Sequence, residues 1–202
     1  IPFLESAEQV LRVVSAAFSQ NLSKAEGAKI HASALKMAKQ LYSAGALPSA
    51  LNAEEASDLF ASCYPLHPVS ALILPHLCQR VAQNERTLFS YLGSNEPHGF
   101  RESLSRLDTV GEWVNLNEIF DYFVLNQTAA VTDYQTHRRW VEVLTAIDRL
   151  GDAPEEEIVV LKTIGLLNIV GMQGGLKASK AVLGICGLSK AHVASATSAL
   201  LA

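Results

Sequence analysis

Residues 155–170 read EEEIVVLKTIGLLNIV, and this stretch decides the fold class of the chain. Three glutamates open it, and acidic side chains in a first turn interact favourably with the positive end of a helix dipole. The residues that follow are apolar on nearly every side of a helix, which is typical of a helix buried at the centre of a core. The segment 151–154, GDAP, lies directly before it and combines a helix stop with a helix start. We therefore predict a central, buried helix over 155–170.

Helical patterns continue outward from this stretch. Ser23 with Glu26, and Asn52 with Glu55, have the spacing of capping boxes, which mark the first turn of a helix. Apolar residues follow at helical intervals and stop at glycines such as Gly45. No stretch alternates as a strand would and no repeat is visible, so we predict an all-α fold. The predicted helices run over 6–18, 23–45, 52–62, 68–82, 84–93, 116–123, 134–150, 155–170 and 178–183, with a last one from Ser189.

Residues 93–112 are the least regular part of the chain, because three glycines and a proline interrupt them. We expect a domain boundary or a mobile loop in this stretch. The boundary divides the chain into a helical, lid-like domain over 1–112 and a helical linker with a further helical domain over 113–202.

The composition is that of a folded protein, with 49% hydrophobic and 18% charged residues, whereas disordered chains have few apolar groups and much charge. The net charge of −4 is spread over both halves: residues 1–100 hold 7 basic and 8 acidic residues, and 101–202 hold 9 and 12. Neither half has the basic excess of a dedicated nucleic-acid-binding protein. The segment 176–202 is an exception, because it has three lysines and a histidine but no acidic side chain.

Cys63, Cys78 and Cys186 lack CxxC spacing, and we expect them to be reduced, in a cytoplasmic protein. No apolar run approaches the roughly 20 residues that cross a bilayer, so we expect no membrane contact. The chain begins with Ile-Pro-Phe-Leu and ends with Ala-Leu-Leu-Ala inside an apolar helical run. We expect both ends to be cut from a longer protein.

The chain contains no complete catalytic motif. His67 and His76 lie near Cys63, but a metal site needs three or four clustered ligands with recognisable spacing. We interpret His67 as a packed turn residue and the cysteines as core residues. The glycines of 171–175, followed by Lys177, depart from the GxxxxGK[ST] spacing of a P-loop, and a helix instead of a strand precedes them. We therefore expect no enzymatic activity from this chain.

Residues 64–92 read YPLHPVSALILPHLCQRVAQNERTLFSYL: an extended proline turn, an apolar helix, a polar break and a second helix. This order resembles the helical lid of AAA+-like P-loop ATPases, in which an arginine called sensor 2 reaches the terminal phosphates of the nucleotide. The resemblance implies that Arg86 contacts ATP, because a guanidinium binds phosphate oxygens bidentately, and that Asn84 or Gln83 positions it. The alternative is that Arg86 caps a helix or pairs with a carboxylate.

Residues 155–202 form three predicted helices with short turns, and they resemble the start of a winged-helix domain. In that fold the third helix is the recognition helix, and a hairpin wing follows it. Lys177, Lys180, Lys190 and His192 would lie on the second and third helices, where phosphate contacts are usual. The resemblance therefore implies contact with DNA. The alternative is contact with a protein, since winged helices in large ATPases also mediate protein contacts.

Taken with GEWVNLNEIFDYFV and RRWVEVLTAIDRL, these segments are similar to the region after the nucleotide-binding core in large prokaryotic AAA+/STAND-type ATP-binding proteins. Some members of this group are associated with phage defence or DNA processing. The resemblance covers roughly 54–190. It implies a non-catalytic regulatory fragment that senses ATP held by the nucleotide-binding core of the same polypeptide and contacts DNA or a partner protein.

The chain itself has no Walker A or Walker B segment, so we expect no cofactor in this fragment and no ATP hydrolysis by it alone. Two alternatives belong to other functional classes. One is a stand-alone helical protein-interaction module, and the other is a DNA-binding regulator that depends on the last three helices alone.

Overall fold

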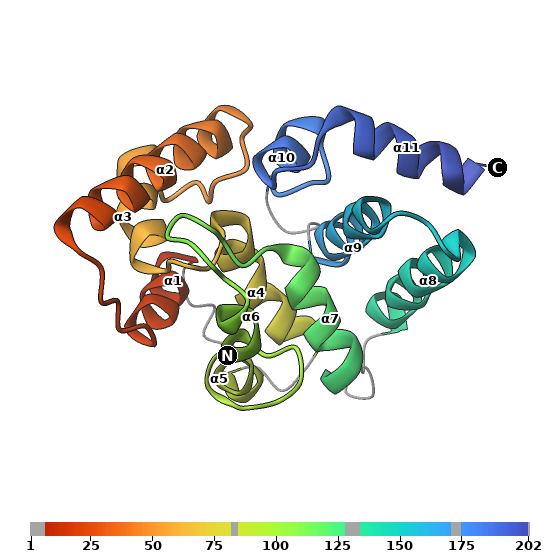
Figure 1. The fold of residues 1–202 in the computed structure, drawn as a ribbon, viewed down its shortest axis with the longest axis horizontal. Helices are drawn as coiled ribbons and strands as arrows, with labels where there is room; N and C mark the ends of the chain where they lie inside the picture. Colours follow the sequence, from red (N-terminus) through yellow and green to blue (C-terminus); the bar gives the residue numbers. More distant parts are fainter. Residues whose placement is uncertain (1–6, 82–84, 128–133, 171–174, 202) are drawn as a thin grey trace.

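The computed structural model describes residues 7–81, 85–127, 134–170 and 175–201. These residues form eleven helices and contain no β-strand, so the all-α prediction is confirmed (Figure 1). The helices are α1 (Ala7–Ala16), α2 (Lys24–Ser43), α3 (Ala53–Ser62), α4 (Pro68–Val81), α5 (Glu85–Gly93), α6 (Phe100–Ser105), α7 (Leu116–Gln127), α8 (Tyr134–Leu150), α9 (Glu155–Val170), α10 (Lys180–Ile185) and α11 (Lys190–Leu201).

The capping boxes predicted at Ser23 and Asn52 are formed, whereas a third, predicted at Ser6 with Gln9, lies partly outside the described residues. Ser23 Oγ accepts a hydrogen bond from the Glu26 backbone N–H at 3.3 Å, and the Glu26 carboxylate accepts one from the Ser23 N–H at 2.8 Å. Asn52 and Glu55 make the same reciprocal pair at the start of α3. The helices that they open, α2 and α3, pack against each other on one side of the molecule (Figure 1). Local sequence chemistry is therefore sufficient to place the start of each helix.

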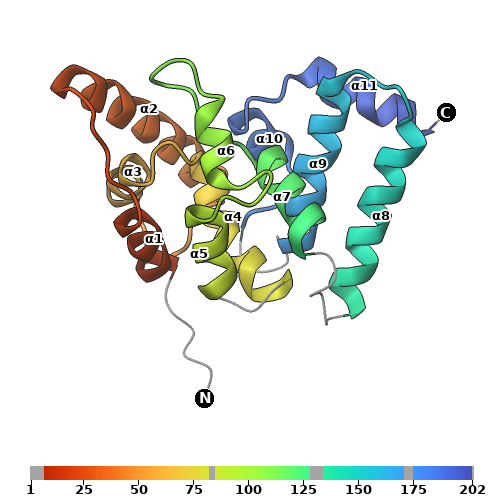
Figure 2. The ribbon, with the colours of Figure 1, turned by 60° about the horizontal axis from the view of Figure 1, so that its bottom comes forward.

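Helix α4 lies at the centre of the molecule. It contacts α1, α2, α5, α7 and α9, and it continues through an internal Pro75. Its middle is apolar and buried on all sides, with Val69, Ile73 and Leu74 fully inaccessible to solvent. Figure 2 shows α4 between the N-terminal helices on one side and α9 on the other. Any displacement of one group of helices against the other must therefore involve α4.

Helix α9 is the second central element, as its sequence predicts. It contacts α4, α7, α8 and α11. A Cβ atom at Gly165 would lie 2.6 Å from Val143 Cγ1, so the missing side chain allows α8 to approach closely. Trp140 of α8 is 1% exposed and stacks on Phe120 of α7 at a centroid distance of 5.2 Å. The helices α7, α8 and α9 thus form one packed group.

Residues 93–112, predicted to be the least regular part of the chain, contain the six-residue helix α6. Phe100 at the start of α6 is buried and packs against Phe18 and Tyr91, with ring centroids 5.0 Å and 6.1 Å apart. Phe18 is far from Phe100 in the sequence, which explains why a local pattern did not indicate this contact.

A single cluster of buried side chains contains residues from both sides of position 112. The His67 N–H donates to the Val114 carbonyl at 3.0 Å, and the Val114 N–H donates to the Pro65 carbonyl at 2.8 Å. The division into 1–112 and 113–202 and the winged-helix detail of the second part stay predictions.

Candidate functional site

The N-terminal end of α4 is joined to the C-terminal end of α10 by His67. The His67 ring is 4% exposed, and its Nε2 lies 3.1 Å from the Ile185 carbonyl oxygen. Its Nδ1 accepts a hydrogen bond from the Val69 N–H at 3.2 Å. Because Nδ1 is an acceptor, the proton must be on Nε2, which donates to Ile185. The ring therefore bridges two helix ends as a neutral tautomer, which confirms His67 as a packed turn residue.

Burial keeps His67 in this neutral form. Desolvation lowers the pKa of His67 from 6.5 to about 4, although the hydrogen bond to Ile185 acts in the opposite direction. A neutral imidazole at neutral pH is compatible with a structural bridge. A charged imidazole in the same place would be buried without a carboxylate to balance it.

The C-terminal end of α4 is joined to the C-terminal end of α9 by Arg80. Arg80 Nη1 donates to the Ile169 carbonyl at 3.2 Å, and Arg139 Nη1 of α8 donates to the Asn168 carbonyl at 2.7 Å. The last carbonyls of a helix have no partner within the helix and carry partial negative charge, so guanidinium donors stabilise them. Both ends of α4 are thus bonded to the ends of C-terminal helices.

Helices α10 and α11 are joined by a four-residue turn, 186–189. Gly187 in this turn has φ +80°, a conformation that residues with a side chain rarely adopt. Ser189 Oγ accepts from the His192 N–H at 3.1 Å and so caps α11. The Ser195 hydroxyl donates to the buried Glu157 carboxylate of α9, which holds α11 against α9. Two helices joined by a short turn with a glycine are typical of a helix-turn-helix unit.

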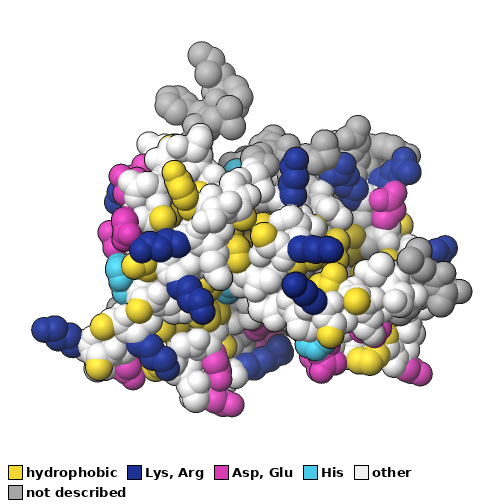
Figure 3. Space-filling view, turned by 90° about the horizontal axis from the view of Figure 1, so that it is seen from above, with side chains coloured by type: hydrophobic (Ala, Val, Ile, Leu, Met, Phe, Trp, Pro, Cys, Tyr) yellow, Lys and Arg dark blue, Asp and Glu magenta, His cyan; other side chains and the backbone are white. Residues whose placement is uncertain are grey.

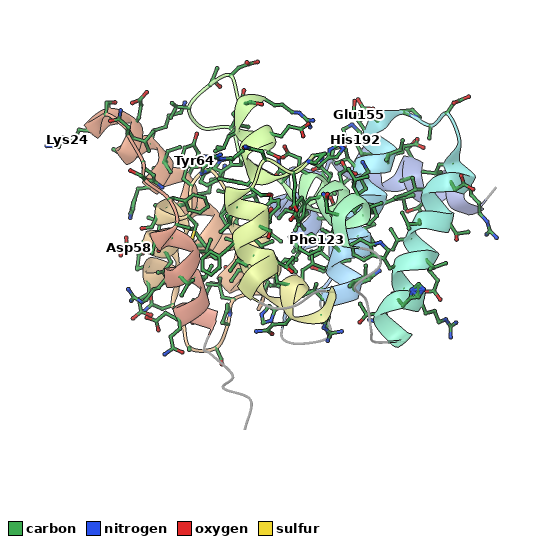
Figure 4. The ribbon with its side chains drawn as sticks, turned by 90° about the horizontal axis from the view of Figure 1, so that it is seen from below. Lys24, Asp58, Tyr64, Phe123, Glu155 and His192 are labelled. Atoms are coloured by element: carbon green, nitrogen blue, oxygen red, sulfur yellow. The ribbon has the colours of Figure 1, made fainter. Side chains whose placement is uncertain are left out.

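The four predicted nucleic-acid-binding residues, Lys177, Lys180, Lys190 and His192, are all exposed, but three of them line different grooves. Lys177 lines a groove of about 920 Å³ over α8 and α9. Lys180 lines a groove of about 590 Å³ between α2 and α10. His192 lines one of about 380 Å³ that also holds Glu155 and Glu156, and Figure 4 shows Glu155 beside His192. His192 therefore lies in a more acidic environment than Lys177 or Lys180.

The structure adds two lysines that the sequence analysis missed. Lys39 of α2 lines the same groove as Lys180, and Lys36 lies one turn before it on the exposed side of α2. Figure 3 shows this face of the molecule, with Lys and Arg side chains over α2 and over α10 and α11. The sequence shows that α2 has a polar side, but it carries no signal that this side lies next to α10.

The proposed nucleotide-sensing residues cannot be placed as a site. Gln83 and Asn84 lie outside the described residues. Arg86 belongs to α5, but its side chain is likewise outside what the structure describes. Contact of these residues with a nucleotide stays a prediction.

No group of three metal-ligating side chains occurs within the described ranges. Burial raises the pKa of the Cys63 and Cys78 thiols to about 12, which makes both poor nucleophiles. Among the residues that the structure describes, no helix is both long enough and apolar enough to cross a bilayer.

Comparisons of this chain with protein-family models, with curated proteins and with solved structures found no match.

Proposed function

We propose that this chain is a non-catalytic regulatory part of a larger ATP-binding protein. In this role the lid-like helices respond to a nucleotide held by the ATP-binding core, and the C-terminal helices contact DNA or a partner protein. The observation that carries the proposal is the double attachment of α4. His67 before α4 bonds to the end of α10, and Arg80 near its end bonds to the end of α9.

This attachment supports a path between the two ends of the chain. Arg86 lies in α5, which packs on α4. A nucleotide that prefers one position of α5 shifts the population of that position by its difference in affinity. Because α4 is bonded to both α9 and α10, a shift of α4 changes the position of the helix-turn-helix unit.

The first test is Arg86→Ala in the longer protein that contains this chain. We expect slower ATP hydrolysis with an unchanged circular dichroism spectrum, since on this proposal the substitution removes the guanidinium that contacts the phosphates. Arg101→Ala, an exposed arginine on α6, is the matched control and is expected to leave turnover unchanged. Normal turnover by the Arg86 variant would contradict the sensor role.

A second candidate function, a stand-alone protein-interaction module, is favoured by one observation. The groove of about 920 Å³ over α8 and α9 has an apolar floor that includes Val143, Ala146, Leu161 and Ile164. Such a floor is suited to the apolar face of a partner helix. In that case Ala146→Asp, which places a charge in the groove without removing the Val143 contact to Gly165, abolishes partner capture while Arg86→Ala has no effect.

A further inference from the structure

We propose that α2 and α10 together form a phosphate-contacting surface for double-stranded nucleic acid, with Lys36 and Lys39 from α2 and Lys177, Lys180 and Lys190 from the C-terminal part. This inference deepens the proposed function and rests on it, because it requires the C-terminal helices to contact nucleic acid. It assigns a role to α2, which lies in the predicted lid-like domain.

The two halves of this surface are held together by direct backbone contact. A Cβ atom at Gly175 would lie 1.7 Å from the Gly45 carbonyl oxygen, so the chain before α10 touches the turn after α2. Lys39 and Lys180 line opposite sides of the groove that results. The distance between them is therefore set by the fold and not by flexible loops.

The stripe of α2 that faces this groove is polar and exposed. Lys36, Lys39, Gln40 and Ser43 follow at helical spacing, opposite the buried Ile30 side of the helix. The groove itself is lined by polar and small side chains of α2 and α10 and by Ile185. The described residues that line it include no Trp, Tyr or Arg, the residue types that dominate protein–protein interfaces.

Positive side chains predominate on this surface, although Glu142 lines the same groove as Lys177 and Glu155 and Glu156 lie beside His192. Residues 176–202 contain no acidic side chain. Lys39 has Glu54 at 3.4 Å, but both side chains are more than half exposed, and such pairs contribute little. The excess of lysines on this face contrasts with the net charge of −4 of the whole chain.

Double-stranded nucleic acid is the polyanion that fits these features best. Its phosphates form a regular, closely spaced row of charges, which a row of lysines on two helices can follow. A site for a single phosphate group would instead require converging donors in one pocket, and the five lysines are spread over α2, α10, the start of α11 and the segment before α10.

The test measures how salt weakens the binding of the 202-residue chain to a labelled duplex of about 30 base pairs, followed by fluorescence anisotropy. If each of the five lysines contacts one phosphate, raising the salt concentration from about 50 to about 200 mM is expected to weaken binding about 500-fold. The variant Lys36→Ala/Lys39→Ala loses two of these contacts and is expected to show a decrease of only about 40-fold.

The matched control is Lys24→Ala/Arg101→Ala, which removes the same charge elsewhere. Lys24 is at the other end of α2, about 18 Å along the helix from Lys36, and Figure 4 shows it at the edge of the molecule. This control is expected to keep the salt dependence of the unaltered chain. Circular dichroism of both variants checks that the helices are retained.

The outcomes separate the two proposals. If Lys177→Ala/Lys180→Ala reduces the salt dependence and Lys36→Ala/Lys39→Ala does not, the role of α2 is overturned and DNA contact by the C-terminal helices stands. If the unaltered chain does not bind the duplex at low salt, both ideas are overturned. Binding to vesicles of anionic lipid without binding to the duplex overturns the nucleic-acid proposal as well.

Discussion

The acid sensitivity of this fold is expected to depend on His67. In the folded chain the pKa of His67 is about 4, because the ring is buried, whereas its ordinary value is 6.5. The unfolded chain therefore binds a proton more readily than the folded chain between these two values. The stability that follows from this is fully present above pH 6.5 and is lost as the pH falls toward 4.

The size of the loss follows from the two pKa values. At about pH 5 the unfolded ring is almost fully protonated and the folded ring is almost neutral, which lowers the free energy of unfolding by about 2 kcal/mol. The perturbation is His67→Gln, which cannot titrate. At about pH 8 this variant is expected to be less stable by about 1 to 3 kcal/mol, because one amide cannot replace both ring hydrogen bonds.

The assay is urea denaturation of both proteins at about pH 8 and about pH 5, followed by circular dichroism at each pH. We expect the difference in stability between the two proteins to be smaller by about 2 kcal/mol at the lower pH. All other titrating groups, including His76, are present in both proteins and cancel in the comparison. An equal difference at both pH values would refute the reasoning, since it would mean that His67 titrates normally in the folded chain.

Three further predictions concern the contacts that hold the C-terminal helices. Gly175→Ala is expected to destabilise the chain by more than about 2 kcal/mol in urea denaturation, because its Cβ would overlap a carbonyl after α2. Gly184→Ala, whose Cβ has open space, is expected to be neutral or stabilising by about 1 kcal/mol. Arg80→Met leaves a carbonyl in the last turn of α9 without its donor, and a loss of about 1 to 3 kcal/mol is expected; an unchanged urea midpoint would contradict the bridge. Ser195→Ala removes the donor to buried Glu157 and is expected to increase hydrogen exchange in α11 without affecting α2.

The helix starts could be predicted from the sequence because their chemistry is local. Ser23 with Glu26 and Asn52 with Glu55 satisfy each other's backbone within four residues, and both boxes are formed. The sequence predicts that α10 starts at Ala178, two residues too early. The helix begins at Lys180, and Ser179 is its N-cap residue. The structure resolves this because the Ser179 hydroxyl accepts from an N–H in the first turn.

The site could be predicted only in part, because its contacts join distant segments. The sequence indicated Lys177, Lys180 and Lys190 through the absence of acidic neighbours along the chain. Lys36 and Lys39 carry no such signal, since their relation to α10 depends on where the chain turns. The acidic neighbours of His192 could not be predicted from the sequence either, because they are more than thirty residues away from it along the chain.

The proposed transmission through α4 depends on how polar groups are distributed along this helix. Its middle is close-packed and apolar, and such packing resists sliding, because displaced side chains lose contacts on every side. The two polar bridges, His67 and Arg80, lie at its ends and bond to carbonyls at the ends of α10 and α9. On the proposed function, a displacement of α4 beside α5 would pass through these two contacts to the ends of α10 and α9.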